Sequence, residues 1–538
     1  MVHERSQETT GTRFFRKPKL RLLILGFLFA AALGLRLYGI NQPPMEFDPP
    51  RQYHGALLAR GLYEWLLSGN LRTVPPDGII EPPILELLAS CAYLVSGGEH
   101  LWIPRLLSAL FWMVGGIFLY LIAKKLVSPN AAVFSVAFYL FIPYGVLASR
   151  AVMPDPLMIL LLIVAIFTIS RYHEQPTTLR LIVATVASSV AIFVKPGICL
   201  FQVFGLFISL AIYRQGVRRS LINPHLLMFV SLSILPSGLY YLYGTILAGF
   251  LRGQVSDKVV PQLPLKASFW EGWLAQVWFI FGFVALAGAF LGVLLLRKGW
   301  ARTLMIGLWG GYFLFGLTFT AKTYTVPYYS LQLIPVVALS LGPVADSAMK
   351  RLNRTADSTH LGRAGLRNYG KAIVFALSIS ALALSAVEQR QTISEIAQQD
   401  RRAPIYAHYV ATFHEIGKVV NHSRRTLVLF DGPQTLQNPD PNYSYALMYY
   451  GRLSGRPWPY PARSVFHQAG GPQIATQELS PEKRLDKYSK NHPPEYFVIS
   501  KSWWKREELR DLRAFLTKNF PIIAQNDSYV VFDLRKRT

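Results

Sequence analysis

A series of long apolar runs, separated by short polar segments, is the feature that most limits how this chain can fold. A membrane-crossing helix needs about 17 to 25 apolar residues, and on that length the sequence predicts about eleven spans, with 10 to 13 as the range. The predicted spans are Leu22–Ile40, Leu106–Leu121, Ala131–Leu147, Leu157–Ser170, Leu181–Val194, Gly197–Tyr213, Leu226–Tyr243, Trp273–Leu296, Thr303–Phe319, Tyr328–Ala345 and Ile373–Val387. We therefore expect a polytopic α-helical membrane protein.

The charged residues agree with this interpretation and give the spans a direction. Only 16% of the residues are charged, whereas soluble proteins have about 25%. Lys and Arg concentrate in alternate connections, which face the cytoplasm by the positive-inside rule. These basic segments are 13–21, 124–125, 171–180, 214–219, 297–302 and 350–371. Topology thus explains most of the formal charge of +25, and no nucleic-acid partner is expected.

The two ends of the chain differ in character. Residues 1–21 are a basic, cytoplasmic segment, and no small-residue cleavage site follows Ile40, so we expect the first span to remain as an anchor. The membrane module is expected over 22–388. An odd number of spans then places 389–538 outside the cytoplasm. There, the short apolar runs "TLVLFDG", "EYFVIS" and "YVVFDL" alternate with helical pieces, which predicts one small soluble α/β domain.

The first outer loop, 41–104, is unusually acidic. Most of the acidic residues that fall in outer loops before Glu388 lie between Glu46 and Glu99. Within the loop, "YHGALLARGLYEWLL" and "ILELLASCAYLV" have apolar residues at helical spacing, which predicts amphipathic helices on the membrane surface. A second outer loop, 244–272, is interpreted as a flexible segment.

Two carboxylates of the first outer loop are candidates for chemistry. Asp48 follows the first span closely enough to be held beside the bundle, where it could accept a proton from a hydroxyl nucleophile; a helix N-cap or a solvated loop acid is the alternative. Glu81 precedes two prolines that suit the start of a helix. It could orient an acceptor, bind a metal ion, pair with an arginine, or cap that helix.

Further charges map to the same outer face, at the ends of other spans. Arg150 and Asp155 lie in a short turn, so they must pair together, join a neighbouring site or reach water. Lys195 and Lys322 could bind an anionic phosphate at headgroup depth, or extend to water as lysines at span ends often do. The nearby Tyr324, Tyr328 and Tyr329 could equally form an interfacial aromatic belt. A carboxylate base beside phosphate-binding cations fits group transfer from a lipid phosphate.

Other site chemistries find little support in the sequence. Cys91 and Cys199 are the two cysteines and lie far apart, which argues against a disulfide framework or a cysteine metal site. No CxxC, HExxH, P-loop or GxGxxG pattern occurs. No cofactor is therefore indicated, and the need for a divalent metal ion is left open.

The segment "LRLYGINQPPMEFD" resembles the end of the first helix and the acidic loop of polyprenyl-phosphate sugar transferases with the C-type glycosyltransferase (GT-C) fold. This superfamily includes the dolichyl-phosphate-mannose protein mannosyltransferases and the bacterial lipid A aminoarabinose transferases. The similarity continues through "RQYHGALLARGLYE", "EPPILELLASCAYLVSGGEHLWIPRLLSAL" and "SRAVMPDPLMILLL", then more loosely through "FVKPG" and "YYSLQLIPVVAL". It covers residues 22–345.

The resemblance implies a GT-C-like bundle and an inverting transfer of a sugar from undecaprenyl or dolichyl phosphate to a hydroxyl of a lipid, glycan or protein acceptor. It also implies an extracytoplasmic site in the plasma membrane, the inner membrane of a bacterium. Asp48 would be the general base, with Glu81 and Asp155 as further catalytic candidates. The candidates for binding the donor phosphate are Arg51, Arg150, Lys195, Lys322 and Tyr324, and Glu46, His54 and Tyr328 are other candidates.

Two other classes of protein remain as alternatives. A transporter or lipid flippase would also carry ionisable residues, but at mid-span and with broken helices in paired halves. A non-catalytic membrane scaffold would use its outer domain to bind partners. The gathering of charges at one face favours the enzyme over the transporter.

Overall fold

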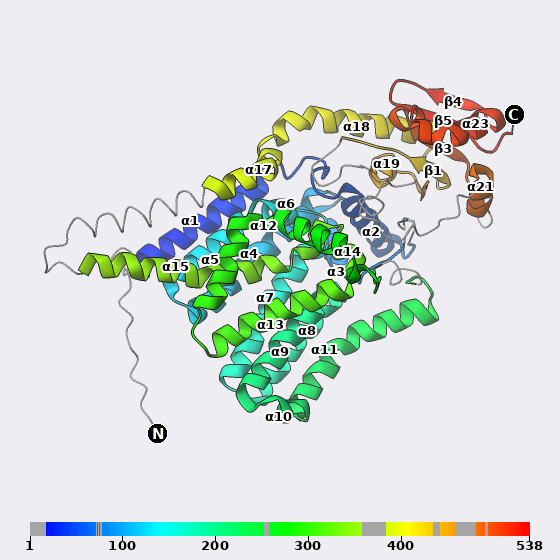
Figure 1. Ribbon diagram of the computed structural model, residues 1–538. Coiled ribbons are helices and arrows are strands. Elements are labelled where there is room, and N and C mark those ends of the chain that lie inside the picture. Colours follow the sequence, from blue (N-terminus) through cyan, green and yellow to red (C-terminus); the bar gives the residue numbers. More distant parts are fainter. Residues whose placement is uncertain are drawn as a thin grey trace.

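The computed structural model describes residues 18–537, except for 72, 74, 76–77, 252–257, 358–382, 434–441, 459–479 and 490–492. A bundle of long apolar helices makes up most of this part of the chain (Figure 1). A smaller domain with a β-sheet lies at one end of the bundle, on the side of α2 (Pro49–Ser68).

The helices of the bundle follow the order of the predicted spans. They are α1 (Pro18–Leu37), α4 (Trp102–Leu126), α5 (Pro129–Phe141), α6 (Pro143–Ala148), α7 (Asp155–Glu174), α8 (Thr178–Val194), α9 (Ile198–Gln215), α10 (Val217–Leu221), α11 (Pro224–Leu242), α12 (Ala267–Leu295), α13 (Trp300–Thr318) and α15 (Leu333–Asp357). Across the described ranges, seven helices are long and apolar enough to cross a membrane: α1, α4, α7, α9, α11, α12 and α15. The predicted span Ile373–Val387 lies mostly outside the described residues.

Two of the predicted spans are interrupted, one before a proline and the other at a glycine. Pro143 divides Ala131–Leu147 into α5 and α6, because the residue before a proline is driven out of the helical region, and Ile142 has an extended ψ of 123°. In α12, Gly282 adopts a φ of 72°. The helix resumes after it because the Glu388 carboxylate accepts the N–H groups of Phe283, at 3.0 Å, and Val284, at 3.4 Å.

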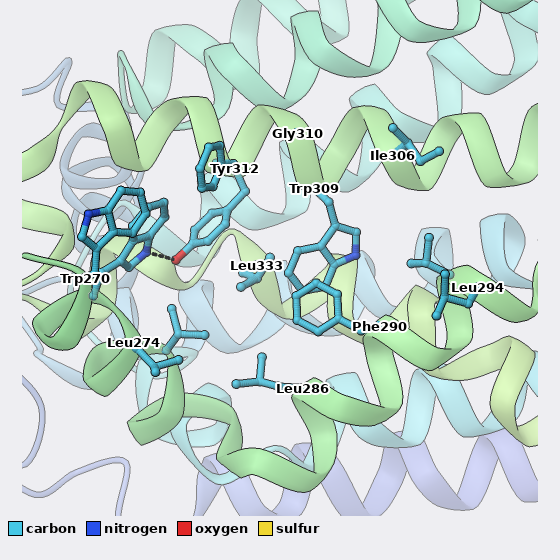
Figure 2. A pocket seen from close by; sticks show the side chains of 14 residues that line it. Trp270, Leu274, Leu286, Phe290, Leu294, Ile306, Trp309, Gly310, Tyr312 and Leu333 are labelled. Carbon is cyan, nitrogen blue, oxygen red and sulfur yellow. Dashed lines mark hydrogen bonds between the residues drawn. The ribbon is translucent and has the colours of Figure 1, made fainter. Parts of the chain in front are cut away.

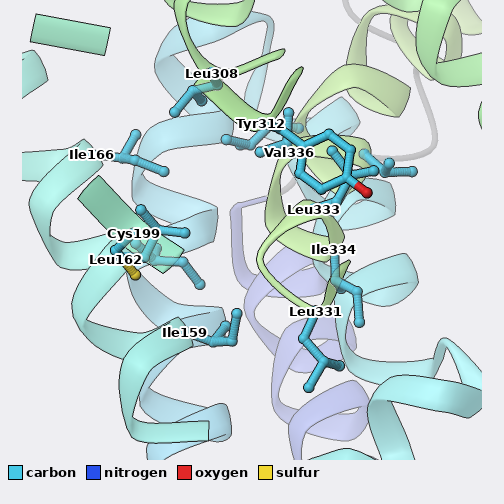
Figure 3. Close-up of a cluster of buried hydrophobic side chains, with 14 of the residues drawn as sticks. Ile159, Leu162, Ile166, Cys199, Leu308, Tyr312, Leu331, Leu333, Ile334 and Val336 are labelled. Carbon is cyan, nitrogen blue, oxygen red and sulfur yellow. The ribbon is translucent and has the colours of Figure 1, made fainter. Parts of the chain in front are cut away.

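The core of the bundle is formed where helices that are distant in sequence cross. Figure 3 shows apolar side chains of α7, α9, α13 and α15 meeting there, including Ile159, Cys199, Leu308 and Val336, all buried. Helices α9 and α13 are in close contact at Gly311, where an added Cβ would collide with the Phe201 carbonyl. Such contacts between backbones need small residues, as is usual between helices in membranes.

The first outer loop forms the two helices that its apolar pattern predicts, α2 and α3 (Ile84–Ser96). Helix α2 begins at Pro49 and Pro50, which suit the first turn, with Asp48 as its N-cap. Gly69 ends the helix with a φ of 70°, a value that favours glycine. These two helices position much of the candidate site.

The small domain confirms the predicted α/β architecture. Its five-stranded sheet has the order β2-β1-β3-β5-β4, with β1 parallel to both neighbours and the other pairs antiparallel. The strands are β1 (Thr426–Leu429), β2 (Gly455–Pro457), β3 (Tyr496–Ser500), β4 (Ile522–Gln525) and β5 (Tyr529–Asp533). The helices are α17 (Arg390–Ala397), α18 (Gln399–Val419), α19 (Ser444–Tyr450), α21 (Pro481–Ser489), α22 (Lys501–Trp504) and α23 (Arg510–Asn519).

The sheet supports α2 through α19. Tyr53 and Leu57 of α2 belong to the same buried apolar cluster as Val498 of β3. Arg60 of α2 donates through Nη1 to the Tyr449 carbonyl at 2.8 Å, and its guanidinium lies 4.0 Å from the centre of the Tyr449 ring. The C-terminal domain therefore holds in place the helix that Asp48 caps.

Candidate active site

Asp48 lies at the start of α2 in an uncommon backbone conformation. Its φ of 37° and ψ of 66° are left-handed, and its side chain accepts the Arg51 N–H at 3.3 Å. Non-glycine residues in this region are rare and concentrate at functional sites. Burial raises the pKa of the Asp48 carboxyl, although the nearby Arg51 charge opposes this. The N-cap alternative is thus correct as a description of the structure. The raised pKa also makes the Asp48 carboxylate a better proton acceptor than an ordinary Asp.

Arg51 and Glu81 form an ion pair beside Asp48. Arg51 Nη2 lies 2.6 Å from Glu81 Oε2. Burial works against the charge of Glu81, but Arg51 and then Lys195 stabilise it and hold its pKa at about 2. Glu81 is therefore ionised at neutral pH and cannot serve as a proton donor there. Of the roles expected for it, the structure shows pairing with an arginine.

Asp155 and Lys195 form a second, more deeply buried pair. Lys195 Nζ contacts both carboxylate oxygens of Asp155, at 2.7 and 2.8 Å. It also faces the rings of Tyr328 and Tyr329, at 5.0 and 5.5 Å from their centres. Both tyrosines belong to the turn η4 (Pro327–Ser330). The ammonium is thus held by a carboxylate on one side and aromatic faces on the other, a cation–π arrangement.

A cavity of about 290 Å³ adjoins both ion pairs. Its polar walls include Glu81, Lys195 and Lys258, and Ile192 and Ile234 are among its apolar walls. Lys258 belongs to the second outer loop and was not among the predicted site residues. Burial lowers its pKa, with Glu81 opposing that shift and the neighbouring cations adding to it. The cavity combines two ammonium groups with apolar walls, as an anionic amphiphile would require.

Arg150 does not join this site, nor does it pair with Asp155. Its Nη2 lies 3.3 Å from Glu46 Oε1, and Arg105 Nη2 lies 2.6 Å from the same oxygen. Arg36 is buried nearby and donates to the Ser149 hydroxyl at 2.7 Å. Glu46 and Arg150 therefore belong to a buried structural cluster. Arg105 is a member that the sequence pattern did not reveal, because it precedes an apolar run without any distinctive motif.

The remaining candidates lie around the site at different depths. His54 lines a small recess with Arg51, Glu81 and Glu86. Glu86 was not predicted as a site residue, and burial raises its pKa to about 7.

Lys322 and Tyr324 lie in and just after α14 (Thr320–Thr323). The positive charge of Lys322 helps to lower the pKa of Lys258. The Tyr324 ring packs 6.0 Å from that of Phe269, against α12 rather than against the cavity.

A larger apolar groove of about 690 Å³ lies between α12, α13 and α15. Figure 2 shows Trp270, Leu274 and Phe290 on one side of it and Trp309 and Tyr312 on the other. The Tyr312 hydroxyl bonds to the Ser330 hydroxyl of η4 at 2.8 Å. The turn η4 thus contacts Tyr312, which lines this groove, and contributes Tyr329 to the lining of the cationic cavity.

No group of three or more His, Cys, Asp or Glu residues converges as a metal-ligand set among the residues that the structure describes. Two carboxylates of the site are instead paired with cations: Glu81 with Arg51 and Asp155 with Lys195.

Comparison with known proteins gives this arrangement a context. Residues 80–241 match the family model of the dolichyl-phosphate-mannose-protein mannosyltransferases. The structure is similar to that of ArnT from Cupriavidus metallidurans bound to undecaprenyl phosphate, with a TM-score of 0.56 and 15% identity over 94% of this chain and 97% of that one. The chain has the GT-C fold. The matched segment includes Glu81, Asp155 and Lys195, and the resemblance to GT-C polyprenyl-phosphate sugar transferases is confirmed.

A second GT-C structure extends the comparison. The archaeal oligosaccharyltransferase AglB from Archaeoglobus fulgidus, in complex with an inhibitory peptide and a dolichol-phosphate, has a TM-score of 0.57 and 12% identity over 96% of this chain and 74% of that one. No curated protein matches the sequence significantly. The family model and the fold are both those of GT-C glycosyltransferases, and the long apolar helices indicate a multi-pass membrane protein.

Proposed function

We propose that this GT-C glycosyltransferase moves a sugar from a polyprenyl-phosphate donor to an acceptor hydroxyl at the extracytoplasmic face of the plasma membrane. One observation carries the proposal: Asp48, the Arg51–Glu81 pair and the Asp155–Lys195 pair converge at one end of the bundle, beside a cavity with cationic and apolar walls. The basic connections lie at the other ends of the spans, which supports an outward-facing site.

The arrangement suits a single displacement. The acceptor hydroxyl gives its proton to the Asp48 carboxylate while its oxygen bonds to the anomeric carbon of the sugar. The bond between that carbon and the phosphate oxygen breaks, and the lipid phosphate leaves with the electron pair. Because attack and departure occur on opposite faces, the anomeric configuration inverts.

The departing phosphate needs positive charge, and the site provides it. Lys195 and Lys258 line the cavity, and Arg51 is held beside it by Glu81. Cations fixed in a site that excludes water stabilise developing negative charge strongly. Asp155 positions Lys195, and Ile192 and Ile234 offer an apolar path for the first isoprene units. Undecaprenyl phosphate in ArnT and dolichol-phosphate in AglB are ligands of this chemical type.

The direct test is sugar transfer by the purified full-length protein from a polyprenyl-phosphate sugar. Mass spectrometry of lipids and glycans, from cells with the wild-type protein and cells with an inactive variant, would identify the natural sugar and acceptor. Formation of free polyprenyl phosphate together with a glycosylated acceptor supports the proposal. Movement of intact donor across the membrane without transfer would instead indicate a flippase.

Lys258→Gln is expected to weaken donor binding, because it removes an ammonium from the cavity while keeping a polar side chain of similar length. We expect KM for the donor to rise about tenfold, as for the loss of one charged hydrogen bond. Lys266→Gln, in the same loop but exposed, is the matched control. An unchanged KM in Lys258→Gln would remove Lys258 from the donor site.

The pH dependence of transfer should reveal Asp48. Because burial raises the pKa of this carboxyl, kcat/KM is expected to fall with decreasing pH at a value above about 3.9, the pKa of an ordinary Asp. Transfer is lost on the acidic side because a protonated Asp48 cannot accept a proton. A profile that stays flat down to about pH 4 would contradict this assignment.

A further inference from the structure

A small polar recess lies at the end of the bundle opposite the candidate active site (Figure 1). Helices α7 and α9 end there and α11 begins there, close to α10. Its polar lining includes His173, Arg214, Asn223 and His225, and its floor includes Phe207 and Leu226. The free space of about 40 Å³ would hold about three waters, since one water needs about 10–15 Å³ of such volume. A group of phosphate size fits it better than a larger headgroup does.

The recess is built by interactions that hold its polar side chains in place. The Tyr172 hydroxyl bonds to His225 Nδ1 at 2.9 Å, and Asn223 Nδ2 donates to Gln215 Oε1 at 3.0 Å. The Tyr172 ring stacks on Phe207, with ring centres 5.7 Å apart. One wall of the recess is therefore ordered, and Arg214 at the end of α9 contributes its charge.

The charge balance of this region is positive. Arg218 and Arg219 follow Arg214 on α10. The acidic side chain beside the recess, Glu174, is already paired with Lys125 Nζ at 2.7 Å and with Arg171 Nη1 at 3.3 Å. Within the described residues, no ion pair between Arg214 and a carboxylate is found. An anion in the recess would therefore meet a cation rather than a competing carboxylate.

Exposed apolar side chains lie close to the recess along the chain, as expected for a recess that opens toward lipid. Tyr213, Val217, Ile222 and Leu227 are each at least half exposed. Exposed apolar side chains next to arginines are typical of the membrane interface, where the basic end of the bundle is expected to lie. A ligand that reaches the recess from this side carries hydrocarbon as well as charge.

We propose that this recess binds the phosphodiester of an anionic glycerophospholipid in the leaflet opposite the active site. The phosphate would lie against Arg214 and against Nε2 of His225, the ring nitrogen that does not bond to Tyr172. The acyl chains would lie along Ile222 and Leu227. Basic pockets between membrane helices bind acidic headgroups by this chemistry. The inference does not depend on the sugar-transfer reaction, because the two sites lie at opposite ends of the bundle.

The test uses the purified full-length protein in nanodiscs, with native mass spectrometry of bound lipid. Phosphatidylglycerol is compared with phosphatidylcholine of the same acyl chains. We expect a phosphatidylglycerol adduct of the wild type that weakens about tenfold in Arg214→Gln, as expected for one lost charged contact. Arg214→Lys should retain part of it. Arg297→Gln, an exposed arginine at the same end of the bundle but outside the recess, is the matched control.

Three results would overturn the proposal. Equal binding of the two lipids would show that charge is not recognised. Equal loss in Arg214→Gln and Arg297→Gln would show general attraction to the basic face. Displacement of phosphatidylglycerol by an equal concentration of inorganic phosphate would show a site for a soluble anion. A thermal melt of each variant separates lost binding from lost folding, and Arg214 is exposed enough that its replacement should leave the melt unchanged.

Discussion

Asp48→Asn is expected to reduce sugar transfer by about 10²- to 10⁴-fold, the usual contribution of a general base, without changing the melting temperature. The substitution removes a negative charge and the ability to accept a proton. It keeps the features that matter to folding, because Asn is as good an N-cap as Asp and is among the residues that tolerate a positive φ. The measurement is the rate of transfer at saturating donor, with a thermal melt of the same preparation.

Glu64→Gln is the matched control for Asp48→Asn. Glu64 lies on the same helix, where its carboxylate accepts the Thr73 hydroxyl at 2.9 Å, away from both ion pairs. It should transfer sugar at the wild-type rate. Full activity in Asp48→Asn would exclude Asp48 as the base and direct attention to Glu86, whose pKa of about 7 is also suited to proton transfer.

Glu46→Gln is expected to give a large loss of stability, about 3–5 kcal/mol, as when one partner of a buried ion pair is removed. Glu46 is 4% exposed, while Arg105 and Arg150 are fully buried. Without the carboxylate, two guanidinium groups would share a low-dielectric site with no anion. Arg105 also donates to the carbonyls of Ile40 at 2.9 Å and Gln42 at 2.6 Å. The chain segment between α1 and Asp48 should therefore become more mobile in Glu46→Gln.

The control for Glu46→Gln is Glu174→Gln. Glu174 also contacts two basic side chains, but these pairs are partly exposed, and such pairs contribute about 0–1 kcal/mol. Thermal melts in the same lipid and detergent should therefore differ clearly between the two variants. Equal melting temperatures would show that the Glu46 cluster does not stabilise the fold.

The connection between the C-terminal domain and α2 links the two parts of the protein. Tyr53 and Leu57 of α2 share a buried apolar cluster with residues of α19, and Arg60 donates to the Tyr449 carbonyl of α19. These contacts fall within the first twelve residues after Asp48. A base at the start of a helix is positioned as precisely as the helix itself is held. The domain that carries no recognised catalytic motif therefore contributes to the geometry of the site.

Much of the fold follows from local properties of the sequence. The spans were predictable because each apolar run must bury its own backbone hydrogen bonds in a helix when it crosses a membrane. The helices at Pro49 and Ile84 were predictable from spacing and from the prolines that begin them. Gly282 was not, because the break depends on a carboxylate 106 positions later, Glu388, that caps the resumed helix.

The site divides in the same way. By itself the sequence placed Asp48, Glu81, Asp155 and Lys195 at one face, because a charge next to an apolar run can be stable only near the membrane boundary. Only the tertiary structure decided the partners: Arg150 with Glu46 rather than with Asp155, Asp155 with Lys195, and Lys258 beside Glu81. The physical reason is that the energy of an ion pair depends on which helix ends meet within a few ångströms, and that is determined by packing between segments far apart in the chain.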